Sequence, residues 1–508
     1  MSLFRKKSLT TLLAQAAESE KGLKKTLGAG SLVALGIGAI IGAGLFVRTA
    51  AAAGGHAGSA VTISFIIAAI GCAFAGLCYA EFASMIPIAG SAYTYAYTTM
   101  GELVAWIIGW ALILEYALGA ATVSIAWSEF LNKLVGGGIP YEWTHSPFQK
   151  ALDANNVMHY GIINAPALII LALMSLLLIK GTQESAMVNA IIVIIKVAIV
   201  LAFIIIGWSF INPANHTPYM IPADAPPAIQ PDGTQYSYAD TFRHGWGGIL
   251  RGAAIVFFAF IGFDAVSTAA QEAKNPKRDM PIGILGSLVV CTILYILFSW
   301  VLTGVAPYQD FVRSGKEASV AYAIDTYMHG YGWLSKLITL GILAGFSSVI
   351  LVMLMGQSRV FFSMANDGLL PKVFSDLHPK FRTPYKSNAL LFFFVGAFAT
   401  LIPGDITGDL TSIGTLLAFV LVCIGIIIMR KTDPNTPRPF RTPLVPLVPI
   451  LGVLVCSAMI LSLDKITLSS AFAWMVLGLL IYFSYGKNNS KLKGPGDILP
   501  KASDFEKK

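Results

Sequence analysis

Apolar residues occur in long uninterrupted runs along almost the whole chain, and polar residues gather in short segments between them. Most runs are close to the roughly 20 residues that an α-helix needs to cross the hydrocarbon core of a bilayer. The strands of a membrane β-barrel would be about half as long and would alternate in polarity. The pattern therefore predicts a polytopic, all-α membrane protein with about twelve transmembrane helices.

The expected spans share an apolar interior with a polar boundary at each end. They lie at residues 29–56, 59–87, 99–135, 160–180, 186–211, 246–272, 281–305, 334–364, 387–403, 409–429, 444–463 and 469–485. Residues 29–485 are thus the expected transmembrane domain, between a segment 1–28 and a tail 486–508. The polar stretches between the spans are too short to fold alone and have the composition of surface loops.

Composition and charge agree with this prediction and add an orientation. Of the 508 residues, 56% are hydrophobic and 12% are charged. Basic residues concentrate before the first span, after the sixth, eighth and tenth spans, and in the tail. With about twelve spans these segments share one side, which the positive-inside rule places in the cytoplasm. We therefore expect a multi-pass protein of the plasma membrane with both termini cytoplasmic. The net charge of +8 then reflects this topology and does not indicate nucleic-acid binding.

The sequence lacks the patterns typical of a membrane enzyme, an ATP-driven pump, a channel or a metal protein. The 5 cysteines fall inside apolar runs without C-x-x-C spacing, and the 7 histidines are scattered over loops and helix ends. There is no Walker loop and no ring of charge or filter loop. We therefore expect no enzymatic activity, no catalytic residues, no metal and no cofactor.

The first span contains the segment GIGAIIGAGLFV at residues 36–47, with four glycines near its middle. Each glycine weakens a helix by roughly 1 kcal/mol relative to alanine. One interpretation is a helix-packing motif at Gly38 and Gly42. The other is an interruption at residues 42–44, which would expose N–H groups at the start of a half-helix, where a carboxylate is favoured.

The sixth span contains a comparable irregular segment, FFAFIGFDAV, five spans after the first. A five-helix unit repeated once must be inverted in the membrane, because five is an odd number. This is the architecture in which two broken helices meet near the bilayer midplane and bind a substrate with their free backbone groups. Without further evidence, the interruption at residues 42–44 and the packing motif at Gly38 and Gly42 carry equal weight as interpretations of this segment.

Six segments carry a resemblance to a known family: GIGAIIGAGLFV, YAEFASMIPIAGSAYTYAYTTMGELVAWIIGWALILEY, GTQESAMVN, EAKNPKRDMPIGI, GQSRVFFSMANDGLLP and RPFRTPLVPLVPILG. They resemble the amino acid–polyamine–organocation (APC) superfamily, and within it most closely the twelve-helix bacterial members of the cationic amino acid transporter (CAT) family, over about residues 25–485. The resemblance implies the LeuT-like fold with broken helices 1 and 6. Its inverted repeats would cover residues 29–211 and 246–429, followed by extra helices in 444–485.

The resemblance also implies a substrate site built from the backbone of the two breaks. The α-carboxylate would bind the N–H groups of Gly42, Ala43 and Gly44, and the ammonium would bind the carbonyls of Ile40, Phe258 and Ile261. Phe258 would also cover the substrate as an aromatic gate, with ordinary core packing as the alternative.

Ionisable residues inside the spans are functional candidates, because burying a charge in hydrocarbon is costly. In proton-coupled relatives a lysine of the fifth helix stands where sodium-coupled relatives hold sodium, so the resemblance implies that Lys196 couples proton movement to transport. The alternative is a fixed structural cation. Glu115, in the third span, is expected to bind the ammonium or guanidinium of a substrate, or else to hold helices together. Asp264, just past the second break, is expected to be mainly structural.

We therefore expect a proton-coupled amino acid symporter that works by alternating access. Its expected partners are protons, membrane lipids and cationic or small neutral L-amino acids, with arginine, lysine and alanine as candidates. A proton-independent exchanger and a non-transporting amino acid sensor are the alternatives. The residues do not decide the preferred side chain, the stoichiometry, the oligomeric state or an accessory helix.

Overall fold

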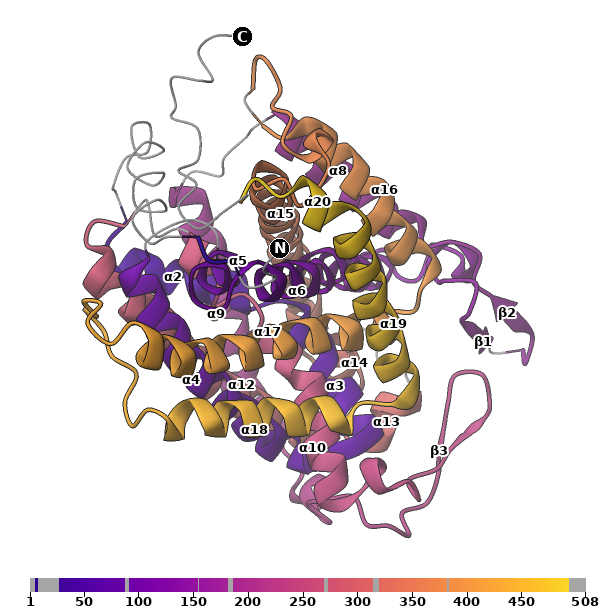
Figure 1. Cartoon of the computed structure of the whole chain (residues 1–508). Coiled ribbons are helices and arrows are strands. Elements are labelled where there is room, and N and C mark those ends of the chain that lie inside the picture. The colour runs from indigo at the N-terminus through magenta and orange to yellow at the C-terminus, as the bar shows by residue number, and fades with distance from the viewer. Residues whose placement is uncertain are drawn as a thin grey trace.

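The computed structural model describes residues 5–7, 27–86, 91–153, 155–180, 186–268, 273–313, 319–381 and 383–492. Its helices pack side by side in a single bundle (Figure 1). Most of the expected segment 1–28 and of the tail 486–508 lies outside the described residues, as does the stretch GTQES at 181–185.

The first half of the chain contains the first five expected spans. The first consists of α2 (Ala29–Ile40), η2 (Gly44–Arg48), α3 (Thr49–Ala52) and η3 (Ala53–Ala57). The second consists of η4 (Gly58–Ala60) and α4 (Val61–Met85), and α5 (Ser91–Thr99) follows it. The third consists of α6 (Glu102–Ile113), η5 (Leu114–Leu118) and α7 (Gly119–Leu134), and the next two are α8 (Ala165–Lys180) and α9 (Ala186–Gly207).

The second half repeats the pattern of an interrupted helix followed by long ones. The sixth span consists of α10 (Gly245–Val256), η10 (Phe257–Phe260) and α11 (Ala265–Thr268), and α12 (Pro276–Val305) follows. After α13 (Tyr308–Arg313) and α14 (Ser319–Tyr327) come α15 (Gly332–Asn366), α16 (Tyr385–Leu401) and α17 (Gly404–Thr432). The last helices are α18 (Leu447–Ser462), α19 (Lys465–Ile481), η13 (Tyr482–Gly486) and α20 (Lys487–Asn489).

The helices have the length and composition of a polytopic membrane protein. Within the described residues, 7 helical segments are long and apolar enough to cross a membrane, and five further apolar helices are 10–17 residues long. The mostly helical, multi-pass fold is therefore confirmed. A count of about twelve spans stays a prediction, because several helices are short or interrupted.

Two small hairpins lie among the loops that join the helices. β1 (Lys150–Leu152) pairs antiparallel with β2 (Met158–Tyr160), and β3 (Ala228–Ile229) pairs antiparallel with β4 (Gln235–Tyr236). Both lie at the edge of the bundle (Figure 1). The end of the bundle that carries these loops is called the loop end below.

A histidine on β2 links the first hairpin to the loop before it. His159 Nδ1 lies 2.8 Å from Glu142 Oε1, and its Nε2 lies 3.6 Å from Asp153 Oδ2. The hydrogen bond to Glu142 raises the pKa of His159, and the Asp153 carboxylate adds to this effect. Because the folded pKa is raised, the contacts stabilise the hairpin at low pH and weaken as the pH rises through that pKa.

The opposite end of the bundle, called the terminal end, holds the described parts of both chain termini. Lys7 Nζ lies 2.8 Å from Asp367 Oδ1 after α15, and Tyr93 of α5 donates to Asp367 Oδ2 at 2.8 Å. Near the C-terminus, Tyr482 donates to Glu102 at 2.9 Å. These contacts close the bundle across helices that are distant in sequence.

Candidate substrate site

The first span is interrupted at the residues that the sequence indicates. α2 ends at Ile40, Ile41 is extended with φ −70 and ψ 105, and the helix resumes at Gly44. The Gly42 carbonyl accepts from Leu45 N at 3.2 Å. In the described chain, the N–H groups of Gly42 and Ala43 donate no backbone hydrogen bond outside the regular helices. These two N–H groups lie at the start of the half-helix that resumes at Gly44, where backbone donors have no partner within the helix.

The sixth span is interrupted in a comparable way. α10 tightens into η10, and Ile261 leaves the helix with φ −59 and ψ 133. The Phe258 carbonyl accepts a long hydrogen bond of 3.3 Å from Ile261 N. Tyr295 Oη donates to the Ala259 carbonyl at 3.0 Å and fixes the interrupted segment against α12. The α-helical hydrogen-bond pattern therefore ends at this point, and the Ala259 carbonyl accepts from a side chain.

The two interruptions contact each other through their backbones. A β-carbon added at Gly44 would lie 2.2 Å from the Cα of Ala259, so only glycine allows this approach. Gly262, with φ +115, lies where an added β-carbon would be 2.8 Å from the Ala39 carbonyl oxygen. The glycines that weaken the first span are therefore needed where the second break packs against it.

The structure brings most of the predicted site residues together. Ile40, Ala43, Phe258 and Ile261 are all buried in the region where the two breaks meet. The burial of Phe258 is compatible with both the gate and core packing, and its role as a gate stays a prediction.

Lys196 lies on α9 and reaches the first span. Its side chain is buried, and its Nζ donates to the Gly38 carbonyl at 2.7 Å. Gly38 is one helical turn before Gly42. The α15 backbone crosses the lysine stem closely, because a β-carbon added at Gly345 would lie 2.7 Å from Lys196 Cε. The ammonium group is therefore tied to the half-helix that ends at the break.

Glu115 lies in η5, the π-helical turn in the middle of the third span. Its side chain is 0% exposed, and neither carboxylate oxygen has a hydrogen-bond partner in the described part of the chain. π-helical turns inside α-helices are frequent at functional sites.

Apolar side chains approach the site from α15. A β-carbon added at Gly42 would lie 3.4 Å from Val349, and one added at Gly119 would lie 3.4 Å from the sulfur of Met353. Both distances are ordinary van der Waals contacts. On the α15 side, Gly42 of the first break thus faces an apolar side chain, and so does Gly119 of the third span.

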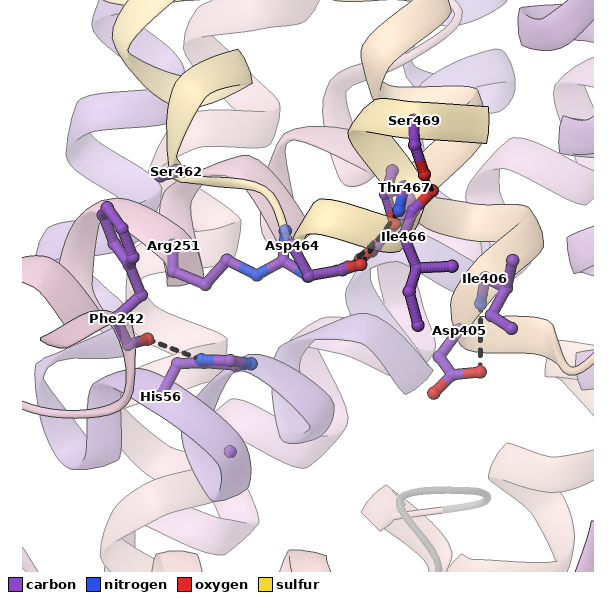
Figure 2. Close-up of polar contacts among 12 residues, drawn as sticks. His56, Phe242, Arg251, Asp405, Ile406, Ser462, Asp464, Ile466, Thr467 and Ser469 are labelled. Carbon is purple, nitrogen blue, oxygen red and sulfur yellow. Dashed lines mark hydrogen bonds and ion pairs between the residues drawn. The ribbon is translucent and has the colours of Figure 1, made fainter. Parts of the chain in front are cut away.

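A cluster of charged side chains, buried except for Asp464, lies between the breaks and the loop end. Arg48, in the half-helix after the first break, forms an ion pair with Asp409 of α17. Arg251 of α10 lies 2.6 Å from the other oxygen of Asp409 and 3.0 Å from Asp464. Figure 2 shows Arg251 extending toward Asp464, which also accepts from the Thr467 N–H at 2.9 Å and so caps α19. Both interrupted helices are thus joined to one aspartate.

This cluster is not among the residues predicted from the sequence. Arg48, Arg251 and Asp409 each lie inside an expected apolar span, and charges in such positions are the signal that could have found them. What the sequence does not show is that the three side chains meet.

A cavity of about 500 Å³ opens on the loop-end side of the cluster. Its lining includes Ala43 of the first break, Arg48, and polar groups such as Asp405 and Lys150. In the described residues, no group of three or more His, Cys, Asp or Glu side chains is arranged to hold a metal ion.

A bundle of apolar helices in which two interrupted helices meet defines a secondary transporter of the membrane. The model of the amino acid permease family matches residues 27–483, and the chain belongs to this family, within the APC superfamily. It is a transporter and not an enzyme.

Three relatives illustrate the range of the family. The branched-chain amino acid permease of Bacillus subtilis is 43% identical over 494 residues, which are 97% of this chain and 99% of the relative. The methylthioribose transporter of the same organism is 40% identical over 494 residues, with the same two coverages. The vacuolar cationic amino acid transporter 4 of Arabidopsis thaliana is 33% identical over 437 residues, 85% of this chain and 68% of the relative.

Replacing Gly44 by alanine should destabilise the protein. The added methyl group would overlap the backbone at Ala259, and such overpacking typically costs about 1–3 kcal/mol. The melting temperature of the purified protein in detergent measures the effect. Gly30→Ala in α2 is the matched control, because no atom lies within 4 Å of its added β-carbon. Equal melting temperatures for the two variants would contradict the close backbone contact.

Replacing Asp409 by asparagine should also lower the melting temperature strongly. The change leaves two buried guanidinium groups without their shared carboxylate, and breaking a buried ion pair costs about 3–5 kcal/mol. Asp376→Asn is the control, since Asp376 pairs with Lys386 at 2.7 Å on the exposed surface. A surface pair is worth about 0–1 kcal/mol. If both variants melt like the unmodified protein, the cluster does not stabilise the fold.

Proposed function

We propose that this protein is a proton-coupled symporter that moves L-amino acids across the plasma membrane by alternating access. The observation that carries the proposal is the contact of the two interrupted helices, which brings the start of the half-helix at Gly44 against the break that contains Phe258 and Ile261. A half-helix N-terminus favours a carboxylate, and unwound carbonyls favour a cation. All amino acids carry an α-carboxylate and an α-ammonium group. These two groups would bind the backbone N–H groups and carbonyls of the breaks without a charged side chain of the protein.

The apolar surroundings of the first break favour small or branched apolar amino acids over arginine and lysine. Val349 lies against Gly42, Met353 lies against Gly119 of the third span, and a long cationic side chain would be desolvated beside such groups. The name of the relative with 43% identity, a branched-chain amino acid permease, supports the same choice. The methylthioribose transporter is nearly as similar, so overall identity does not by itself decide the substrate.

Lys196 is proposed as a proton-coupling residue because its ammonium group holds the Gly38 carbonyl of the first half-helix. A neutral amine would hold that carbonyl less strongly, since hydrogen bonds from charged donors are roughly twice as strong. Protonation would therefore bias the position of the half-helix that ends at the substrate site. In this proposal the loop end faces outward and the terminal end faces the cytoplasm, as the positive-inside rule favours.

Uptake of labelled L-leucine into sodium-free proteoliposomes with an alkaline interior tests the proposal. We expect accumulation above the external concentration, loss of accumulation with a protonophore, and competition by excess L-alanine but little by L-arginine. Exchange without gradient-driven accumulation would support the exchanger instead, and binding without any flux would support the sensor.

Lys196→Ala should reduce gradient-driven accumulation by about tenfold or more while leucine–leucine exchange continues. The reason is that exchange needs the substrate site but no net proton movement. Lys386→Ala removes an exposed lysine far from the breaks and serves as the control. Unchanged accumulation in Lys196→Ala would refute the coupling role of this lysine.

A further inference from the structure

The cavity at the loop end connects the first break with the two small hairpins. Ala43 of the break and Arg48 of the half-helix after it lie in the cavity wall. Residues 149–151, at the start of the first hairpin, and residues 230–231, in the turn between β3 and β4, lie in the same wall. Both hairpins therefore border the space that leads to the first break.

The two hairpins contact each other, and they lie next to each other at the edge of the bundle (Figure 1). The Leu152 N–H donates to the Pro231 carbonyl at 2.9 Å. A β-carbon added at Gly233 would lie 2.9 Å from Leu152 Cδ1, so the turn packs directly on the first hairpin. Lys150 Nζ lies 3.5 Å from Asp232 Oδ2. These five residues are called the hairpin junction below.

The second hairpin is bound to the outer part of the first span. Tyr236 Oη donates to the Gly55 carbonyl at 3.0 Å, and Tyr238 Oη donates to the Gly54 carbonyl at 2.8 Å. Both tyrosines are buried. Gly54 and Gly55 belong to η3, in the part of the first span that follows the break. The second hairpin is therefore fixed to this part of the span.

The first hairpin is bound to a different part of the bundle, the connection between α7 and α8. His159 of β2 lies 2.8 Å from Glu142 in the loop that follows α7. Just after β2, the Asn164 N–H donates to the Thr400 carbonyl of α16 at 3.3 Å. The first hairpin is therefore fixed to the loop between the third and fourth spans and to the end of α16.

We propose that the hairpin junction is a lid on the path of the amino acid between the loop end and the first break. Alternating access requires one part of the bundle to move against another. The junction ties the outer part of the first span to the loop between the third and fourth spans, so it parts when these two move apart. A backbone hydrogen bond and a partly exposed ion pair are each weak contacts, so the hairpins separate without unfolding.

The lid differs in position from the ion-pair cluster at the loop end. Every residue of the junction belongs to a hairpin between spans, whereas Arg48 and Asp409 belong to helices. An amino acid that enters from the loop end meets the hairpins first and the cluster second. The inference rests on the proposed function, because it assigns the lid to the path of a transported amino acid.

Cross-linking the junction tests the lid in the full-length chain. Lys150→Cys and Asp232→Cys are combined and bridged in detergent with a short bifunctional thiol reagent that a reductant cleaves. The native cysteines are buried, so the reagent reaches the introduced pair. After reconstitution without a proton gradient, we expect the bridge to slow leucine exchange by about tenfold or more, because a lid that cannot open blocks turnover. Cleavage of the bridge should restore the rate.

The matched control places the same bridge within one hairpin. Ile229 and Gln235 are partners across β3 and β4. The combined variants Ile229→Cys and Gln235→Cys, treated with the same reagent, should exchange leucine at the unmodified rate. Each single cysteine variant with the reagent measures the effect of modification alone.

A second measurement does not depend on transport. Ala51 lies in the cavity wall on the first span, and Ala51→Cys can be labelled with a bulky, membrane-impermeant maleimide. Adding Asp232→Lys sets two positive charges against each other at the junction, and we expect labelling to become about fivefold faster or more. Asp376→Lys reverses an exposed aspartate paired with Lys386 and should leave the labelling rate unchanged.

The outcomes separate the lid from the proposed function. Unchanged leucine exchange in the bridged Lys150→Cys and Asp232→Cys protein would overturn the lid, as would equal slowing by the control bridge. Failure of the reagent to bridge the junction while it bridges the control pair would contradict the contact itself. Equal labelling of Ala51→Cys with Asp232→Lys and with Asp376→Lys would also overturn the lid. Absence of leucine exchange in the unmodified protein would instead refute the proposed function, and the labelling rates would still decide whether the junction closes the cavity.

Discussion

The close contact of two interrupted helices is the constraint on which the rest of the structure depends. Gly44 allows the backbone of the first span to touch the backbone at Ala259, and Gly262 allows the reverse approach toward Ala39. A helix that is broken inside a membrane leaves backbone groups unsatisfied, which hydrocarbon does not tolerate. The two breaks pack against each other inside the protein and are thereby kept away from the hydrocarbon. Their backbone N–H and C=O groups then lie in the same region of the bundle.

The residues around the breaks act as supports for these two segments. Tyr295 bonds the carbonyl of Ala259, and Lys196 bonds the carbonyl of Gly38. At the loop end, Asp409 joins the half-helices that carry Arg48 and Arg251. Each support reaches an interrupted helix from an uninterrupted one, so the interrupted helices are held in place by continuous helices.

Much of this arrangement could be predicted from the sequence, because its signals are local. Long apolar runs indicate the spans, and glycines at residues 42–44 indicate the first break. A single lysine among apolar neighbours, Lys196, is conspicuous in the same way. The ends of the spans were less predictable: the sixth was expected over 246–272, whereas α10 ends at Val256 and the chain then changes conformation.

The unpredicted features depend on pairing between distant residues. Arg48 and Asp409 are separated by 361 positions, and neither local sequence indicates which residue will form the ion pair. The hairpins were missed for another reason. Their strands are only 2 or 3 residues long, too short to produce a periodic pattern.

The charge balance of the loop-end cluster has a consequence for how the protein responds to membrane voltage. Arg48 and Arg251 carry two positive charges, and Asp409 and Asp464 carry two negative charges, so the cluster is electrically neutral as a whole. Moving one net charge through a potential of 100 mV involves about 2.3 kcal/mol. A rearrangement in which all four groups shift together moves no net charge, so the membrane potential would do little work on it. Any voltage dependence of transport would then come from the charges that cross the bilayer with the substrate.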